Sequence, residues 1–401
     1  MSASVWHKPA RAGASPNPAD APVLSSTSFL NHLEADLPRA TVGCVLRHYA
    51  ASLTIYAVVL GVLRLNPWFR NLLDVGVGSF TAWDFYRDYF LAYAVLAPVG
   101  YLLLRPRSLW HSKNLLILTW LWRITRHLCG RTPREATLTW RPTFQEKHAA
   151  VFLLIKLLYG PLMLNGLMAG INDTPPYLWQ FQAAPTLTVR LDAVYSLFVN
   201  TVFLLDSGLY GFGYHTEAFW LKNQVRYVET SLAGLAVCLM CYPPFNQVTS
   251  TFFGPSNEQM NILFRGSLHH PITWILRGVA VLALLLLMSA SFSLFTKASN
   301  LTHRGIVRRG PYALVRHPGY VGKNLFWLAT LIPVFFTVDA SNPAFPWGRH
   351  LLYCLATAGG FIAWSTIYVL RALTEEKLLR QDPEYVAYCQ KVKYRFIPGL
   401  C

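Results

Sequence analysis

The chain has 401 residues, of which 53% are hydrophobic, 14% are aromatic and only 13% are charged. Soluble globular domains carry about 25% charged residues, so this composition excludes an ordinary soluble protein. The formal net charge is +16. A charge of that size fits two kinds of partner, a nucleic acid or a membrane surface.

The first segment, residues 1–43, is rich in Pro, Ala and Ser and contains no apolar stretch typical of a signal peptide. We expect a tail that is disordered up to about Ser28, followed by a short interfacial helix around residues 29–39. A transmembrane region is predicted over residues 44–296, and it contains a cytoplasmic loop over residues 105–148.

Several windows are apolar over the roughly 18 or more residues that a membrane-crossing helix needs. The seventh predicted span is shorter and contains Pro333, so we expect it to be tilted, broken or only partly inserted. The fold class is therefore an all-α integral membrane protein. We predict about eight transmembrane helices, over residues 46–64, 86–104, 149–171, 191–212, 228–246, 271–296, 323–338 and 350–370.

The positions of the basic residues predict the orientation in the membrane, because loops rich in Lys and Arg stay on the cytoplasmic side. Eight spans return the C-terminus to the side of the N-terminus. With both termini in the cytoplasm, most Lys and Arg residues fall in cytoplasmic segments, where they contact anionic lipid headgroups. We therefore predict a multi-pass protein whose partners are membrane lipids and not nucleic acid. The sequence does not determine the oligomeric state.

The long loop over residues 105–148 contains one helical pattern, residues 112–128. It ends in Arg123, Arg126 and His127, and it is too short and too charged to cross a bilayer. We expect an amphipathic helix that lies on the cytoplasmic membrane surface.

The seven cysteines show no disulfide framework. Cys238 and Cys241 form a C-x-x-C pair inside an apolar segment, without a second pair or a nearby histidine, so we interpret them as small apolar residues of a helix. No metal site is predicted. Cys401 ends the chain without a C-a-a-X box, so the sequence does not predict prenylation of the protein itself.

The C-terminal region, residues 297–401, carries the chemistry. A polar loop, GIVRRGPYALVRHPGYVGK over residues 305–323, is followed by one apolar hairpin and by RALTEEKLLRQDPEYVAYCQKVKYRFIPGL over residues 371–400. The hairpin returns both polar elements to the same membrane face. An Arg-His-Pro or a Glu-Glu by itself is a weak signal, and the order and spacing of the whole set is the stronger one. The residues expected to face each other are Tyr312, Arg316, His317 and Tyr320 on one side, and Glu375 and Glu376 on the other.

This order of residues resembles the isoprenylcysteine carboxyl methyltransferases and their phospholipid methyltransferase relatives. Their pattern is a G-x-Y-x-x-x-R-H-P-x-Y-x-G loop followed by an E-E pair, and the resemblance covers residues 297–400. It implies an S-adenosylmethionine-dependent methyltransferase with a cytoplasmic-side cofactor pocket built from the C-terminal loop and helix. The expected substrate is lipophilic, prenylated or lipid-linked, and it accepts the methyl group on a carboxyl, an amine or a thiol.

Methyl transfer from a sulfonium depends mainly on positioning and electrostatics. The resemblance implies that Arg371, one helical turn before Glu375, contacts the substrate. Gly319 and Gly322 are expected to permit close backbone approach. The catalytic candidates are Arg316, His317 and Glu375. The candidate cofactor contacts are Arg304, Gly305, Ile306, Val307, Tyr312, His317, Pro318, Gly319, Tyr320 and Glu375.

The chain departs from the family pattern at two places. The family often has a histidine at the position of Arg304, whereas here His303 precedes it by one residue. The Phe-Gly that usually comes before the tyrosine-rich tail is replaced by Asp382-Pro383. Both departures fall next to the predicted cofactor contacts.

Two other classes of function fit parts of the sequence. Sterol reductases, which bind NADPH, have a similar R-H-P-N-Y-like loop and tail, but they carry an R-D segment where this chain has Thr-Glu-Glu. They also have asparagine at the position of Gly319. A non-catalytic membrane scaffold is the third interpretation, and it leaves the polar cluster unexplained.

Overall fold

The computed structural model describes residues 41–104, 112–130, 140–218, 221–246, 271–332 and 347–400, and these form helices with two very short sheets. The predicted disordered tail and interfacial helix over residues 1–40 lie outside the described residues. The end of the seventh predicted span and two parts of the predicted loop 105–148, residues 105–111 and 131–139, also lie outside them.

The N-terminal unit is a helical hairpin, α2 (Val42–Leu65) and α4 (Ala82–Leu104). A short helix, α3 (Pro67–Leu73), and an antiparallel pair of two-residue strands, β1 (Gly76–Val77) and β2 (Phe80–Thr81), connect them. The predicted surface helix is confirmed as a helix, α5 (Lys113–Leu128), which packs against α2 and the following long helix.

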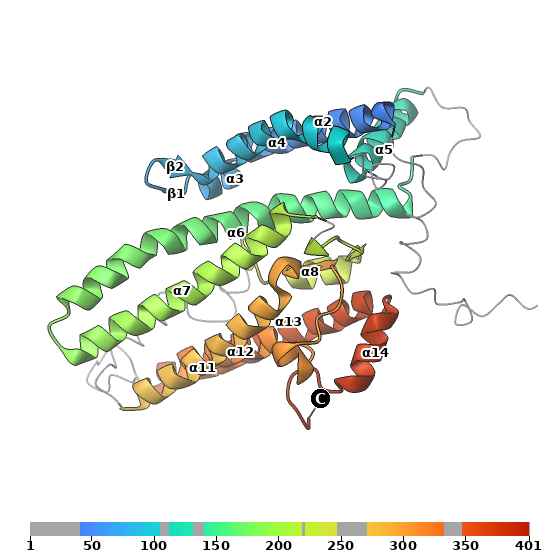
Figure 1. Cartoon of the computed structure of the whole chain (residues 1–401). Helices are drawn as coiled ribbons and strands as arrows, with labels where there is room; N and C mark the ends of the chain where they lie inside the picture. Colours follow the sequence, from blue (N-terminus) through green and yellow to red (C-terminus); the bar gives the residue numbers. More distant parts are fainter. Residues whose placement is uncertain are drawn as a thin grey trace, which may run out of the picture.

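Two long antiparallel helices follow, α6 (Phe144–Ala183) and α7 (Leu187–His215) (Figure 1). Helix α6 exceeds its predicted span at both ends. At its start, Thr143 and Glu146 form a capping box, so the helix begins before the apolar stretch. Near its end, Asn200 of α7 donates hydrogen bonds to Gly170 O (2.9 Å) and Thr174 Oγ1 (3.1 Å), which holds α6 against its neighbour.

The fifth predicted span, over residues 228–246, does not form in the described residues. The chain instead makes a short strand, β3 (Tyr227–Val228), and an eight-residue helix, α8 (Leu232–Leu239). Eight residues rise by only about 12 Å, far less than the roughly 30 Å of a bilayer core. The reason is tertiary, because β3 pairs with strand β4 (Thr302–His303) of the C-terminal region and so holds this segment there.

The C-terminal region contains three longer helices, α11 (Pro271–Leu294), α12 (Pro318–Leu331) and α13 (Trp347–Leu379), and a final short one, α14 (Pro383–Lys391). Between α11 and α12 lie β4 and two 3-10 turns, η3 (Phe295–Lys297) and η4 (Gly310–Ala313). Helices α11 and α12 pack closely along their length.

Within the described residues, five helical stretches have the length and apolar composition to cross a membrane: Val42–Leu65, Phe144–Ala183, Leu187–His215, Pro271–Lys297 and Cys354–Leu379. The structure is therefore that of an all-α membrane protein, and the part of the chain that it describes holds fewer such helices than the eight predicted. Helix α4 is long enough, but three charged residues near its start, Asp84, Arg87 and Asp88, make that end less apolar. Helix α12 has only 14 described residues.

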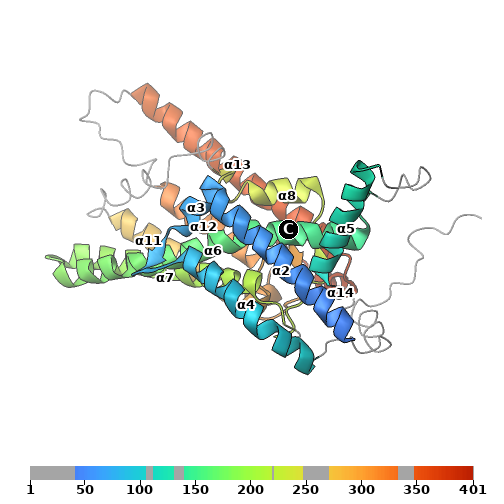
Figure 2. The ribbon, with the colours of Figure 1, turned by 90° about the horizontal axis from the view of Figure 1, so that it is seen from above.

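The helices run roughly along one axis, and the polar C-terminal elements gather at one end. Helix α14, helix α5 and the start of α6 lie toward the same end in both views, opposite the connection between α6 and α7 (Figures 1 and 2). The described part of the predicted cytoplasmic loop and the polar elements of the predicted catalytic region therefore lie toward one end of the molecule.

The core next to the C-terminal loop joins α7, α11 and α12 around buried side chains that include Leu284, Leu287 and Phe326. Gly322 of α12 makes this contact possible. A Cβ at Gly322 would lie 2.7 Å from Ala283 O and 2.9 Å from Leu287 N. A Cβ at Gly319 would meet nothing nearer than 3.8 Å. Close approach is thus required at Gly322 and not at Gly319.

We predict that Gly322→Ala destabilises the protein by about 1–3 kcal/mol, the typical result of overpacking a tight contact. Gly319→Ala is the matched control, because the same added methyl group finds room one turn earlier. Thermal unfolding of both variants in detergent measures the effect. Equal melting temperatures for the two variants would show that the α11–α12 contact does not depend on Gly322.

Candidate functional site

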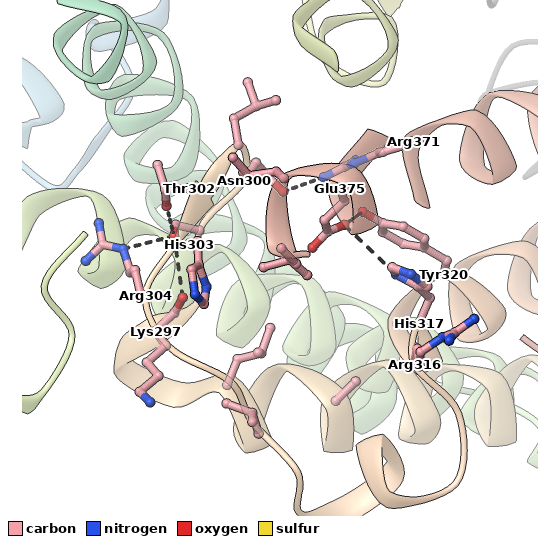
Figure 3. Close-up of a pocket in the computed structure, with 18 of the residues that line it drawn as sticks. Lys297, Asn300, Thr302, His303, Arg304, Arg316, His317, Tyr320, Arg371 and Glu375 are labelled. Atoms are coloured by element: carbon pink, nitrogen blue, oxygen red, sulfur yellow. Dashed lines mark hydrogen bonds and ion pairs between the residues drawn. The ribbon is translucent and has the colours of Figure 1, made fainter. Parts of the chain in front are cut away.

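One cavity gathers nearly all the predicted site residues, and its volume, including its open mouth, is about 1270 Å³. It lies between the loop that precedes α12, the C-terminal part of α13, and elements from α8, α11 and α14 (Figure 3). Of the predicted site residues, only Pro318 does not line it; this residue is buried at the first turn of α12. The predicted residues that line it are Arg304, Gly305, Ile306, Val307, Tyr312, Arg316, His317, Gly319, Tyr320, Arg371 and Glu375.

The loop is held against the C-terminal tail by backbone hydrogen bonds. The Arg316 N–H donates to Tyr394 O (3.0 Å) and the His317 N–H donates to Arg395 O (2.9 Å). Pro318 then begins α12, a position where its missing N–H has no consequence. The Arg-His-Pro sequence therefore joins the tail to the start of a helix.

Glu376 is the buried carboxylate that unites these segments, with only 2% of its surface exposed. Its Oε1 lies 3.0 Å from Arg316 Nε, 3.3 Å from His317 Nε2 and 3.2 Å from Arg395 Nε. Burial of a charged carboxylate is costly unless cations and hydrogen-bond donors surround it. Glu376 and Arg316 thus form a structural ion cluster at the wall of the cavity.

Glu375, the neighbouring residue, has a different environment. Its side chain is 45% exposed, it lines the cavity, and its Oε2 accepts a hydrogen bond of 2.6 Å from the Tyr320 hydroxyl. His317 Nδ1 lies 4.0 Å away. Among the described residues, no Lys or Arg pairs with this carboxylate, so Glu375 can accept hydrogen bonds from a ligand.

Arg371 lies one turn before Glu375 and is 93% buried, with 7% of its surface exposed. Its guanidinium donates to Asn300 Oδ1 and lies over the rings of Tyr320 (5.2 Å) and Tyr242 (5.6 Å). Within the described parts of the chain, it forms no ion pair with a carboxylate. One face of α13 thus places the Arg371 guanidinium and the Glu375 carboxylate in the cavity (Figure 3). In the described residues, Arg371 pairs with no carboxylate and Glu375 pairs with no Lys or Arg.

Arg304 was predicted to contact the cofactor, and it lines the cavity. Two of its three nitrogens bond to the fold, whereas its Nη2 has no hydrogen-bond partner among the described residues. Its Nε donates to Ser299 Oγ (3.0 Å), and its Nη1 donates to Asn223 O (2.8 Å). These bonds tie the cavity wall to the segment that follows α7. The geometry indicates that Arg304 anchors this wall.

Sequence reasoning missed the inner wall of the cavity, which is mostly apolar and comes from α8 and α11. It also missed Lys323, whose Nζ lies 3.9 Å from Asp206 Oδ2 of α7. No local signal identifies these residues, since the α8 segment has the composition of a membrane span. The inner-wall residues include Gly234, Cys238, Leu287, Ala290 and Leu294.

The two adjacent glutamates lead to opposite expectations for stability. We predict that Glu376→Gln destabilises the protein by about 3–5 kcal/mol, because it leaves buried cations without their counter-charge. Glu375→Gln is the matched control and should change stability by less than about 0.5 kcal/mol, as for other surface changes. Thermal unfolding in detergent compares the stability of the two variants. An equally small loss of stability in both would show that Glu376 has no structural role.

No protein-family model, curated protein or solved structure matches this chain. The case for a function therefore rests on the residues of the cavity and their geometry.

Proposed function

We propose that the protein is an S-adenosylmethionine-dependent methyltransferase that acts on a lipophilic or lipid-linked substrate at the cytoplasmic face of a membrane. One observation carries the proposal. A single cavity brings the loop over residues 304–320 together with Glu375 and Arg371, at the end of helices long enough to cross a membrane.

The charges in the cavity fit the amino-acid end of this cofactor, which carries both an ammonium and a carboxylate group. No Lys or Arg pairs with Glu375 in the described residues, and this carboxylate is assigned to the ammonium group. The buried Arg371 supplies positive charge and N–H donors for the carboxylate group. The rings of Tyr320 and Tyr312 line the same space, and aromatic faces attract a sulfonium as they attract other cations.

When bound, the cofactor supplies a methyl group to the lone pair of an acceptor atom, and the carbon–sulfur bond breaks to leave a neutral thioether. The protein's own task is to align the acceptor and exclude water. Arg316 serves this task indirectly, because it pairs with Glu376 and holds the loop in place.

The inner wall of the cavity supports a lipophilic substrate. Leu287, Ala290 and Leu294 of α11 face the same space as Glu375 and Arg371. An apolar wall beside a charged one accommodates a molecule with a hydrocarbon tail and a polar head. The acceptor in this proposal is a carboxyl, an amine or a thiol, and the substrate reaches it from the bilayer.

We predict that the purified protein in detergent binds S-adenosylmethionine or its demethylated product with a dissociation constant in the micromolar range. This corresponds to a binding free energy on the order of −8 kcal/mol. Isothermal calorimetry with the sulfonium cofactor and, separately, with NADPH tests this. Binding of NADPH without binding of the sulfonium would replace the methyltransferase proposal by a membrane reductase.

We predict that Glu375→Gln weakens cofactor binding about ten- to a hundredfold, because a hydrogen bond to a charged group typically contributes about 1.5–3 kcal/mol. Lys377→Gln is the control, since it also changes one charge on α13 but affects an exposed residue outside the cavity. Calorimetric titration of both variants measures the effect. An affinity of the Glu375 variant equal to that of the control would exclude Glu375 as a ligand contact.

A further inference from the structure

Two residues at or next to the departures from the family pattern, His303 and Asp382, are hydrogen-bonded to each other. His303 Nε2 lies 2.7 Å from Asp382 Oδ2, although 79 residues separate the two along the chain. Both side chains are fully enclosed, with 2% of His303 and 0% of Asp382 exposed. His303 also lines the cavity. A histidine on one segment and an aspartate on another thus form a buried pair at the cavity wall.

The hydrogen bonds of His303 assign one neutral tautomer to its ring. The Gly305 N–H donates to His303 Nδ1 over 3.3 Å. A backbone N–H can only donate, so Nδ1 carries no proton and the ring proton is on Nε2, where Asp382 accepts it. His303 is therefore a neutral imidazole that accepts from Gly305 and donates to Asp382.

Asp382 is held in turn by two other elements. Its Oδ2 accepts from Arg226 Nη1 (2.9 Å), next to strand β3, and its Oδ1 accepts from the Glu384 N–H (2.9 Å) at the start of α14. The ring of Tyr227 stacks on the His303 ring at 5.9 Å. Each hydrogen-bonding group of the pair thus has a defined partner, which fixes the orientation of the imidazole.

Gly305 is the residue that depends on this orientation. Its φ is +98°, in the left-handed region that favours glycine. A Cβ there would lie 3.1 Å from Lys297 Nζ and 3.4 Å from Arg226 Nη2. Gly305 lies in the cavity-lining run from Ser299 to Val307, and Ile306 packs against Tyr385 and Tyr388 of α14. The direction of the Gly305 amide therefore affects the shape of this wall.

We propose that His303, oriented by Asp382, is a positioning residue that fixes the Gly305–Val307 wall of the cavity, and that protonation of its imidazole releases that wall. A doubly protonated imidazole has no acceptor left for the Gly305 N–H. The effect on the wall follows from the geometry alone, whereas the identity of the ligand that senses it rests on the proposed function.

The charged groups around His303 determine the pH at which this occurs. Burial lowers the pKa of His303 below its usual value, Arg226 lowers it further, and Asp382 and Glu384 oppose them in part. The imidazole of the folded protein is thus neutral near pH 7. Because the unfolded state takes up the proton first, the stability contributed by the neutral ring declines as the pH falls below about 6.5.

Two substitutions distinguish the acceptor role of the imidazole Nδ1 from the donor role of its Nε2. His303→Asn places an amide oxygen near the position of Nδ1 and keeps an acceptor for Gly305, but it does not titrate. His303→Gln places an amide nitrogen near the position of Nε2, so it keeps the donor to Asp382 and loses the acceptor for Gly305. Melting temperatures of the two variants establish first that both are folded.

The test has two arms, hydrogen exchange at the Gly305 amide without ligand and calorimetric affinity for S-adenosylmethionine, each at pH 7.5 and at a lower pH that protonates His303 in the folded protein. In the natural protein, Gly305 should lose protection at the lower pH, and affinity should fall about three- to tenfold, the loss of one neutral hydrogen bond. The Asn variant should show neither change with pH. The Gln variant should be unprotected and weak at both pH values.

The arms distinguish this inference from the proposed function. Protection of Gly305 that is equal in the natural protein and the Gln variant, and independent of pH, overturns the positioning role. Absence of cofactor binding at both pH values, together with the expected exchange pattern, rejects the methyltransferase proposal and supports the role of His303 in shaping the wall.

Discussion

The arrangement of the cavity depends on one buried carboxylate, Glu376. Its Oε1 lies within 3.3 Å of nitrogen atoms from Arg316, His317 and Arg395. A carboxylate removed from water is stable only when donors and cations replace the solvent, and here those groups come from the loop before α12 and from the C-terminal tail. Because Glu376 belongs to α13, a single side chain joins three segments that are distant in the sequence.

The position of Glu376 also sets the rotation of α13 about its own axis. Successive residues of a helix point about 100° apart, whereas residues four apart share a face. With Glu376 turned toward the loop and tail, Glu375 and Arg371 are turned together toward the cavity. A structural ion cluster and a pair of cavity-facing charges therefore follow from the same short stretch of helix.

The sequence predicted the polar loop and the carboxylates as neighbours, because the apolar hairpin between them returns the chain to one end of the molecule. It failed at the fifth span. Hydropathy measures composition, and the stretch over residues 228–246 is apolar enough. Hydropathy does not predict that β3 pairs with β4. Nor does it predict that Glu229 is buried, with its Oε1 accepting a hydrogen bond of 2.7 Å from the Ser231 N–H. Those contacts hold α8 as a short helix at the cavity wall.

The sequence by itself determined the class of the protein, since long apolar segments need a bilayer. It also predicted the region of the proposed site, since clustered polar residues need partners or a ligand. Only the tertiary structure decided which of two adjacent glutamates faces the cavity, that Arg304 anchors a wall, and that His303 meets Asp382. The physical reason is that these outcomes depend on how helices rotate and pack against distant segments, which no local pattern encodes.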